Sequence, residues 1–437
     1  MMASAFDIAK KQLKIMGVAL SIFTAFGSLN TNTASANSAG DNGILIGDAR
    51  LHPFLDFHTN FVSNPNRAST GGQSDLALTV RPGFNLELTG SGTELFFTTN
   101  AGYKHYLGLN DQDNSAVTSN LSRLNVGAAL EAKFLKQGSL PLNLKIEFLH
   151  DETPRNQTLN QKLTHNMISS NLGFDAKPGG GALKFTLNYK PSIDLYPEAD
   201  EALTTHRHVA SFKTLWKFLP KTATFFETSF DALMYLSDTP VLSVDNTDDT
   251  STTTVVNQDI QFFNVYTGLT GSITEKFRVL LRLGYGQALL TETQLATGES
   301  NPAGFLGQVD LKFKSSNNIV IGAGFNRTLS GAALYKYMID NNIYLSSKAT
   351  LARRWGFSVK GSVSMLEYGK LSIDSTDTNR SDTMIRVEAV ASVAVTDWFV
   401  IALVDKVETL ITDYSLNGSE APKYFYNDLF LRLSVRY

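Results

Sequence analysis

The segment YFYNDLFLRLSVRY, residues 424–437, ends the chain with an alternation of apolar and polar side chains that continues to the last residue. From Leu429 onward the odd positions are apolar or aromatic and end with Tyr437, while Arg432 and Arg436 lie between them. Because successive strand residues point to opposite faces, this pattern predicts a β-strand with one apolar and one largely charged face. Most soluble domains leave their last residues frayed, whereas this terminus is predicted to lie within a sheet.

The composition is compatible with a membrane protein in spite of a mean hydropathy of only -0.09. No stretch beyond the first residues is long enough for a transmembrane helix, but a membrane-spanning strand turns only alternate residues to lipid and gives a weak hydropathy signal. The formal net charge of -3 gives no sign of a nucleic-acid partner. The absence of cysteine excludes disulfides, thiolate zinc sites and a cysteine nucleophile.

Residues 1–36 are predicted to be a Sec-type signal peptide. Three lysines within 10–14 form a basic region, IMGVALSIFTAF (15–26) is a short apolar region, and the small residues ASA precede the expected cleavage point. We expect a short periplasmic N-terminal segment at 37–48 and a single barrel domain over 49–437. The mature chain is therefore predicted to be exported.

Strand-like alternation recurs in pairs along the rest of the chain, with no amphipathic helix of ordinary length between the strands. In FRVLLRLGYG (277–286), for example, apolar residues at odd positions alternate with Arg278 and Arg282. Short connections such as LPKT (219–222) and RRWG (353–356) alternate with long polar ones such as 237–258. Transmembrane β-barrels have this asymmetry, with short periplasmic turns and long external loops.

These patterns predict an all-β fold, a single antiparallel transmembrane β-barrel of about eighteen strands. An even strand number places both termini on the periplasmic side of the outer membrane of a Gram-negative bacterium. Outer-membrane lipid and the barrel-assembly machinery are the partners expected of such a protein. The alternative is a soluble all-β protein such as a propeller or a stack of sandwiches.

The three tryptophans favour the membrane alternative. Each lies beside a predicted short turn, so in a barrel all three would lie at the same membrane interface, where amphipathic rings are favoured. In a soluble core the tryptophans would not be expected to lie beside the short turns in this way. The terminal tyrosine would join them, and the predicted interface girdle consists of Trp216, Trp355, Trp398 and Tyr437.

The polar face of the predicted strands collects many charges. A lipid-facing Arg or Lys at the bilayer midplane costs about 2–4 kcal/mol, so this face is expected to line the lumen. The charges either pair across neighbouring strands and hydrate the wall, or form a lining that selects permeants. Asp405 falls on the apolar face by strict alternation, and either a bulge or a place near the rim would account for it. The predicted lumen-lining residues are Arg81, Lys104, Arg123, Glu131, Lys145, Glu147, Arg278, Arg282, Asp310, Lys312, Lys360, Arg386, Glu388 and Arg432.

No catalytic residue, cofactor or metal site is predicted, and the chain is not expected to be an enzyme. His206 and His208 have an i, i+2 spacing that can bind a metal, but no third ligand stands out. Asp56 and His58 share a strand face without any matching serine motif. The acidic segment 245–249 could hold Ca²⁺, although a solvated loop is the simpler interpretation.

The segment GDARLHPFLDFHTNFVSN (47–64) resembles the first strand of a family of porin-like outer-membrane barrels, the β-barrel porin 2 type. This family includes the exopolysaccharide-export barrels of myxobacteria. The resemblance covers the architecture from residue 49 to 437 and supplies no catalytic residues. It implies a pore that exports a surface or secreted polysaccharide together with a separate periplasmic export protein. A general diffusion porin for small polar solutes is the alternative, and a surface adhesin or structural barrel is a third class.

Overall fold

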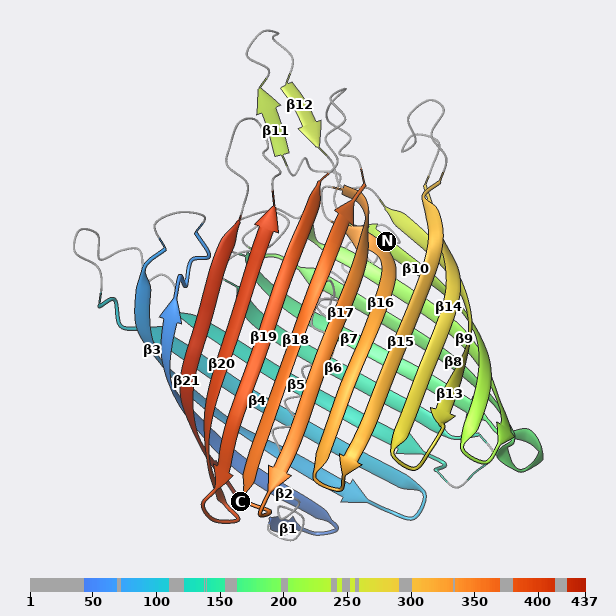
Figure 1. The fold of residues 1–437 in the computed structure, drawn as a ribbon, viewed down its shortest axis with the longest axis horizontal. Coiled ribbons are helices and arrows are strands. Elements are labelled where there is room, and N and C mark those ends of the chain that lie inside the picture. The colour runs from blue at the N-terminus through green and yellow to red at the C-terminus, as the bar shows by residue number, and fades with distance from the viewer. Residues whose placement is uncertain are drawn as a thin grey trace, which may run out of the picture.

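Strands that pair with their neighbours in sequence make up most of the described chain. The computed structural model describes residues 43–68, 72–109, 122–136, 138, 140–153, 163–197, 203–236, 242–245, 252–255, 259–290, 301–332, 335–369, 380–412 and 423–437. Eighteen strands, β2 to β10 and β13 to β21, form one antiparallel sheet, and β21 pairs with β2 to close it (Figure 1). The predicted fold class and strand number are confirmed.

The barrel strands are mostly 12 to 17 residues long, enough to cross the hydrocarbon core at a tilt. Their bounds are β2 Ala49–Ser63, β3 Ser74–Thr89, β4 Thr93–Tyr106, β5 Arg123–Phe134, β6 Leu142–Thr153, β7 Leu163–Ala176, β8 Leu183–Leu195, β9 Thr205–Leu219, β10 Thr222–Tyr235, β13 Ile260–Ser272, β14 Phe277–Leu289, β15 Ala303–Ser316, β16 Ile319–Ala332, β17 Tyr335–Leu351, β18 Trp355–Tyr368, β19 Ser381–Ala394, β20 Phe399–Thr412 and β21 Tyr424–Arg436.

A few short elements accompany the barrel. A short strand within the predicted N-terminal segment pairs with the start of β2, and a separate two-stranded hairpin lies between β10 and β13. These elements are β1 Ile44–Ile46, β11 Leu242–Asp245, β12 Thr252–Val255 and the single-turn 3₁₀ helix η1 Pro178–Gly181. Within the described ranges no helix has the length and apolar character needed to cross a membrane.

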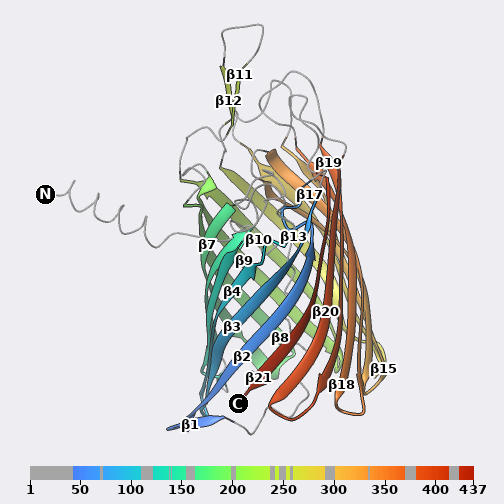
Figure 2. The ribbon, with the colours of Figure 1, turned by 90° about the vertical axis from the view of Figure 1, so that its left-hand side faces the viewer.

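The terminal strand closes the barrel. Its ladder with β2 extends from Phe54 opposite Arg436 to Ser63 opposite Asn427, and the backbone N–H of Tyr437 donates to the carbonyl of Pro53 at 3.1 Å. Figure 2 shows β21 beside β2 along this seam. The alternation at the end of the chain is therefore that of a strand paired on both sides.

The connections differ between the two ends of the barrel. At the end where β1 and the C-terminus lie, they are short, and the predicted turns 219–222 and 353–356 are among them (Figure 1). At the other end most strands are separated by longer segments, with one exception. Only residues 333 and 334 separate β16 from β17, a short connection that the sequence did not predict. Which end faces the periplasm stays a prediction.

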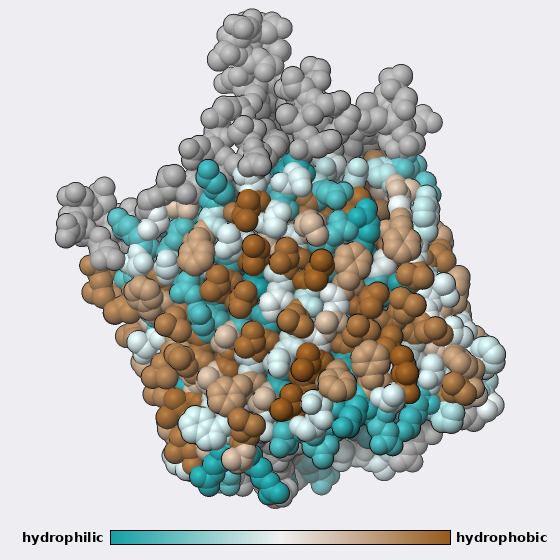
Figure 3. Space-filling model, in the orientation of Figure 1, coloured by the Kyte–Doolittle hydropathy of each residue, from teal (hydrophilic) through white to brown (hydrophobic). Residues whose placement is uncertain are grey.

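Alternate residues of each strand face opposite sides of the wall. On β21, Leu431 is 44% exposed on the outside, whereas Ser434 on the inside is 1% exposed. Large apolar side chains cover the outer surface of the barrel as a broad band (Figure 3). An apolar band around a closed barrel with charges inside is the surface that a bilayer requires.

Asp405 lies within this outward face, and both explanations predicted for it are wrong. The ladders of β20 with β19 and β21 continue past it without a bulge, and it lies near the middle of β20. Its carboxylate accepts a hydrogen bond of 2.5 Å from the side-chain amide of Asn427, which also faces outward from β21. The outward carboxylate is therefore stabilised by a neighbouring amide donor, and the strand continues without a bulge.

The Asp405–Asn427 pair gives a test of this outward placement. Asn427→Leu should lower the free energy of unfolding by about 1–3 kcal/mol, because it leaves a carboxylate in lipid without its donor. The double variant Asp405→Leu/Asn427→Leu removes both partners and should recover most of this loss. Urea titration in detergent micelles, followed by tryptophan fluorescence, measures both. A double variant as unstable as Asn427→Leu would contradict the placement.

Candidate functional site: the charged lumen

The predicted lumen-lining residues all occupy inward-facing positions of the register. They share the strand face opposite to that of the exposed apolar side chains, and most lie across from another charged or polar residue. Whether they select permeants stays a prediction. Cross-strand neighbours that include at least one of these residues are Arg81 and Asp56, Lys104 and Arg123, Glu131 and Lys145, Arg278 and Lys312, Lys360 and Glu388, and Arg386 and Glu408.

One wall of the lumen, formed by β2 to β4 and β19 to β21, is closely packed. The ammonium of Lys104 lies 2.8 Å from the carboxylate of Asp428, and the amide of Asn60 donates to the same carboxylate at 2.8 Å. The hydroxyl of Tyr426 donates to it at 3.2 Å. Lys104 and Asp428 are each only 8% exposed, so this ion pair is buried and satisfied by additional hydrogen bonds.

Arg67, from the connection between β2 and β3, packs against the same wall. Its Nε lies 3.2 Å from a carboxylate oxygen of Glu408, and its guanidinium lies 4.7 Å from the ring centre of Tyr426. Burial alone would lower the pKa of Arg67, but the adjacent Glu408 carboxylate outweighs it and holds this pKa above its usual value. Arg67 therefore stays charged and links this connection to the barrel.

Glu408 is shared between several partners. It also accepts hydrogen bonds from Arg386 Nε at 3.0 Å and from the hydroxyl of Tyr424 at 2.7 Å. Val62 and Leu410 pack beside these groups in a buried apolar cluster. On this side, near the end with the long connections, side chains therefore fill the space next to the wall.

Toward the short turns, the wall formed by β5 and β6 is open to water, whereas His165 and Met167 on the part of β7 nearer the long connections are buried. The ammonium of Lys145 lies 2.7 Å from Glu147 and 3.4 Å from Glu131, but all three side chains are substantially exposed. Exposed pairs of this kind contribute little to stability, because solvent screens them. The lumen thus holds a dry ion-paired group beside the seam between β21 and β2 and a hydrated group on β5 and β6.

Basic side chains without acidic partners line the lumen near the short-turn end. We call them the basic patch, which is formed by Arg278, Lys312, Lys314, Lys348 and Lys360 on β14 to β18. All are exposed and face inward, and none forms an ion pair with a residue of the described chain. Arg278 and Lys312 lie directly opposite each other. Like charges in this position repel, and Glu388, which lies opposite Lys360, forms its ion pair with Lys406 instead, so the patch is a locally positive surface.

Two members of the basic patch were missed in the sequence. Lys314 has the same parity as Lys312, so continuing the alternation to the end of the strand would have found it. Lys348 shares the inward parity of Tyr344 on β17. Lys348 can be assigned from the sequence only if the strand alternation is continued through the polar residues that precede it, where the apolar pattern is weak.

The structure separates the histidine pairs that the sequence singled out from further ligands. His206 and His208 lie on the outward face of β9, where the ring nitrogen Nδ1 of His208 hydrogen-bonds the hydroxyl of Tyr189 at 2.8 Å. Asp56 pairs with Arg81, and His58 stacks on Phe430 at 4.9 Å. In the described ranges no three His, Asp or Glu side chains are grouped to hold a metal. Residues 248 and 249 of the acidic segment lie outside these ranges.

The predicted girdle residues lie at the short-turn end. Trp216, Trp355, Trp398 and Tyr437 are all exposed. Each tryptophan lies beside a phenylalanine, and the ring centres of Trp216 and Phe218 are 6.0 Å apart. This clustering of exposed aromatic rings at one end is typical of a membrane interface, although the girdle itself stays a prediction.

Together these features define a class of protein, the transmembrane β-barrel of the outer-membrane type. The wall is closed, its outside is apolar, and its inside is charged and partly hydrated. Only helices and closed barrels satisfy every backbone polar group within a bilayer.

Comparison with known proteins places the chain in no family. No family model matches the sequence, and no curated protein is similar to it. Among solved structures, OccAB4 of Acinetobacter baumannii has 9% identity and a TM-score of 0.41, with 89% of this chain and 98% of that chain covered. The siderophore receptor PirA of Pseudomonas aeruginosa has 8% identity and a TM-score of 0.42, with coverage of 90% and 81%. The FrpB iron transporter of Neisseria meningitidis has 9% identity and a TM-score of 0.45, with coverage of 88% and 81%.

The dry ion-paired group can be tested by removing one member of its buried pair. Lys104→Met should lower the free energy of unfolding by about 3–5 kcal/mol, because Asp428 would remain buried without its cation. Lys145→Met is the matched control and should cost no more than about 1 kcal/mol, since its partners are hydrated. Urea unfolding in micelles measures both. Equal losses in the two variants would show that the two groups do not differ.

Proposed function

We propose that this chain is a diffusion pore of the outer membrane that favours small anionic solutes. Barrels of roughly 16–18 strands are wide enough to leave an aqueous channel. The basic patch is the observation that carries the proposal, because it is a positive surface on the inner wall whose side chains form no ion pair within the described chain. Rings or strips of charge along a pore attract counter-ions and so set its selectivity.

Other charged side chains of the lumen support this assignment because they form ion pairs with one another. Glu227 is held by Lys213 at 3.1 Å and by Arg282 at 2.6 Å, and Asp175 is held by Lys184 at 2.9 Å. The Asp175 pair is neutral, whereas Glu227 with its two cations keeps a single positive charge, so these groups add little to the charge of the lumen. The selectivity of the pore is therefore set by the unpaired basic patch.

The orientation and partners of the barrel belong to the same proposal. The short-turn end faces the periplasm, so both termini lie there, and the barrel-assembly machinery inserts the chain into outer-membrane lipid. The short connections at that end support this orientation, since transmembrane barrels have short periplasmic turns and longer external loops.

Polysaccharide export with a periplasmic export protein remains a separate hypothesis. It rests on the resemblance of residues 47–64, and no family model supports it. Deletion of the gene tests it directly. Unchanged surface polysaccharide in the deletion strain would remove the hypothesis, whereas loss of the polymer would favour it over solute diffusion.

Ion selectivity tests the proposed pore. In planar bilayers with a KCl gradient, the reversal potential of the wild-type protein should show preference for chloride. The variant Lys312→Gln/Lys314→Gln/Lys348→Gln should lower the chloride-to-potassium permeability ratio by roughly 2- to 10-fold, because the local potential falls. The matched variant with Arg at the same positions keeps the charge and should keep the ratio. A cation-selective wild type, or an unchanged ratio in the Gln variant, would contradict the proposal.

A further inference from the structure

The barrel wall has a notch between β15 and β16 at the end opposite the short turns. Their ladder stops at Gly307 opposite Arg327, although β15 begins at Ala303 and β16 continues to Ala332. Over this stretch the two strands stay paired with β14 and β17 on their other sides. The strands therefore separate from each other toward the rim.

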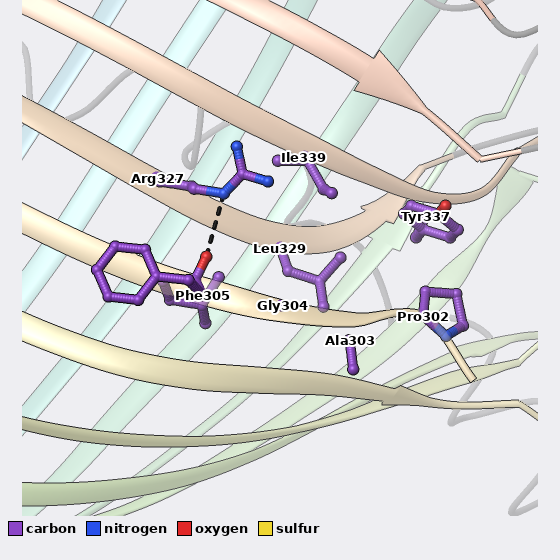
Figure 4. Close-up of a pocket in the computed structure, with 9 residues that line it drawn as sticks. Pro302, Ala303, Gly304, Phe305, Arg327, Leu329, Tyr337 and Ile339 are labelled. Carbon is purple, nitrogen blue, oxygen red and sulfur yellow. Dashed lines mark hydrogen bonds between the residues drawn. The ribbon is translucent and has the colours of Figure 1, made fainter. Parts of the chain in front are cut away.

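A cavity of about 90 Å³ occupies this notch. Its lining is mainly apolar and includes Leu329 and Ile339, with Tyr337 nearer the rim (Figure 4). The ring of Phe305 beside it is largely exposed on the outer face. Leu329, Tyr337 and Ile339 also pack against a buried cluster that includes Phe262 and Leu306, so the cavity lies within the wall, with the exposed ring of Phe305 on its outer side.

Arg327 lies at the deep end of the notch and faces outward. Its Nε donates to the backbone carbonyl of Phe305 at 3.1 Å, and one terminal nitrogen donates to the side-chain oxygen of Asn341 at 2.6 Å. Glu367, on the next strand, accepts from the Asn341 amide at 3.5 Å and forms no ion pair with Arg327. A guanidinium has five N–H donors, so this one keeps free donors and has no paired anion in the described structure.

The level of Arg327 relative to the membrane is indicated by the aromatic side chains around it. Tyr285 and Phe305 lie opposite each other on β14 and β15, next to the rung that holds Arg327, and both are exposed outward. Aromatic girdles mark the two interfaces of a transmembrane barrel, where lipid headgroups lie. Below this level, exposed Ile343 and half-buried Phe325 continue the apolar band.

We propose that the notch binds the phosphate headgroup of a membrane lipid. The phosphate accepts the free N–H donors of Arg327, and the acyl chains run along the outward apolar side chains beneath, Phe325 and Ile343 among them. Arginine presents paired donors that match phosphate oxygens. The bound anion would compensate the cation, and the headgroup would fill the opening between the strands. This assignment is independent of what passes through the lumen.

Lipid binding to the purified barrel tests the proposal. The probes are dioleoyl phosphatidic acid and dioleoyl glycerol, which share acyl chains but differ in the phosphate, added to the full-length protein in nonionic detergent. Native mass spectrometry should show retention of phosphatidic acid and much weaker retention of the diacylglycerol. Arg327→Met should weaken phosphatidic acid binding roughly tenfold, because a charge-assisted contact is lost.

The controls separate this site from other sources of binding. Arg278→Met removes a lumen-facing cation and should leave phosphatidic acid binding unchanged, whereas Arg327→Lys should retain part of it. Excess inorganic phosphate should not displace the lipid, since the acyl chains contribute to binding. Equal retention of both lipids by the wild type, displacement by inorganic phosphate, or unchanged binding in Arg327→Met would each overturn the proposal. If Arg327→Met does not fold, the wild-type lipid comparison and the phosphate competition still decide it.

Discussion

Closure of the sheet between β21 and β2 is the constraint on which the rest of the structure depends. A bilayer core offers no water to unpaired N–H and C=O groups, so a spanning sheet must have no free edge. The ladder from Phe54 opposite Arg436 to Ser63 opposite Asn427 removes both edges at once. Once the sheet is closed, each strand has one face toward lipid and one toward the lumen. The alternation of side chains along the strands then follows from the two solvents.

The charged residues of the lumen serve two different purposes in two regions of the barrel wall. Beside the seam, Lys104, Asp428 and Asn60 form a buried network that holds strands from opposite ends of the chain together. Such a network contributes to the specificity of closure, because an unpaired partner there would be costly. On β14 to β18 the basic patch is hydrated and unpaired, which weakens the sheet locally and leaves a positive surface in the pore. Structure and permeation therefore depend on different charged residues.

The features that could be predicted from the sequence are those that depend on the alternation of neighbouring residues within a strand. Alternation and turn composition act over a few residues, so the strands, the short turns and the inward charges could be assigned without coordinates. Contacts between distant strands could not, since the Lys104–Asp428 pair and the Asp405–Asn427 hydrogen bond depend on the register across neighbouring strands. The insertion of Arg67 and the notch beside Arg327 were likewise hidden. Arg67 lies in a connection, and the notch lies where the β15–β16 ladder ends early, so neither follows from the alternation of side chains along the strands.

The most direct test of the central claim is the environment of successive residues along one strand. The chain contains no cysteine, so single cysteines can be placed at each position from Phe357 to Val363 on β18 and spin-labelled in lipid bilayers. Collision with oxygen, which concentrates in hydrocarbon, should be high at Val359 and the other odd positions. Collision with a water-soluble nickel chelate should be high at Lys360 and the other even positions. A period of two in opposite phase for the two reagents is the predicted result, and equal access of the chelate to both sets would contradict the account.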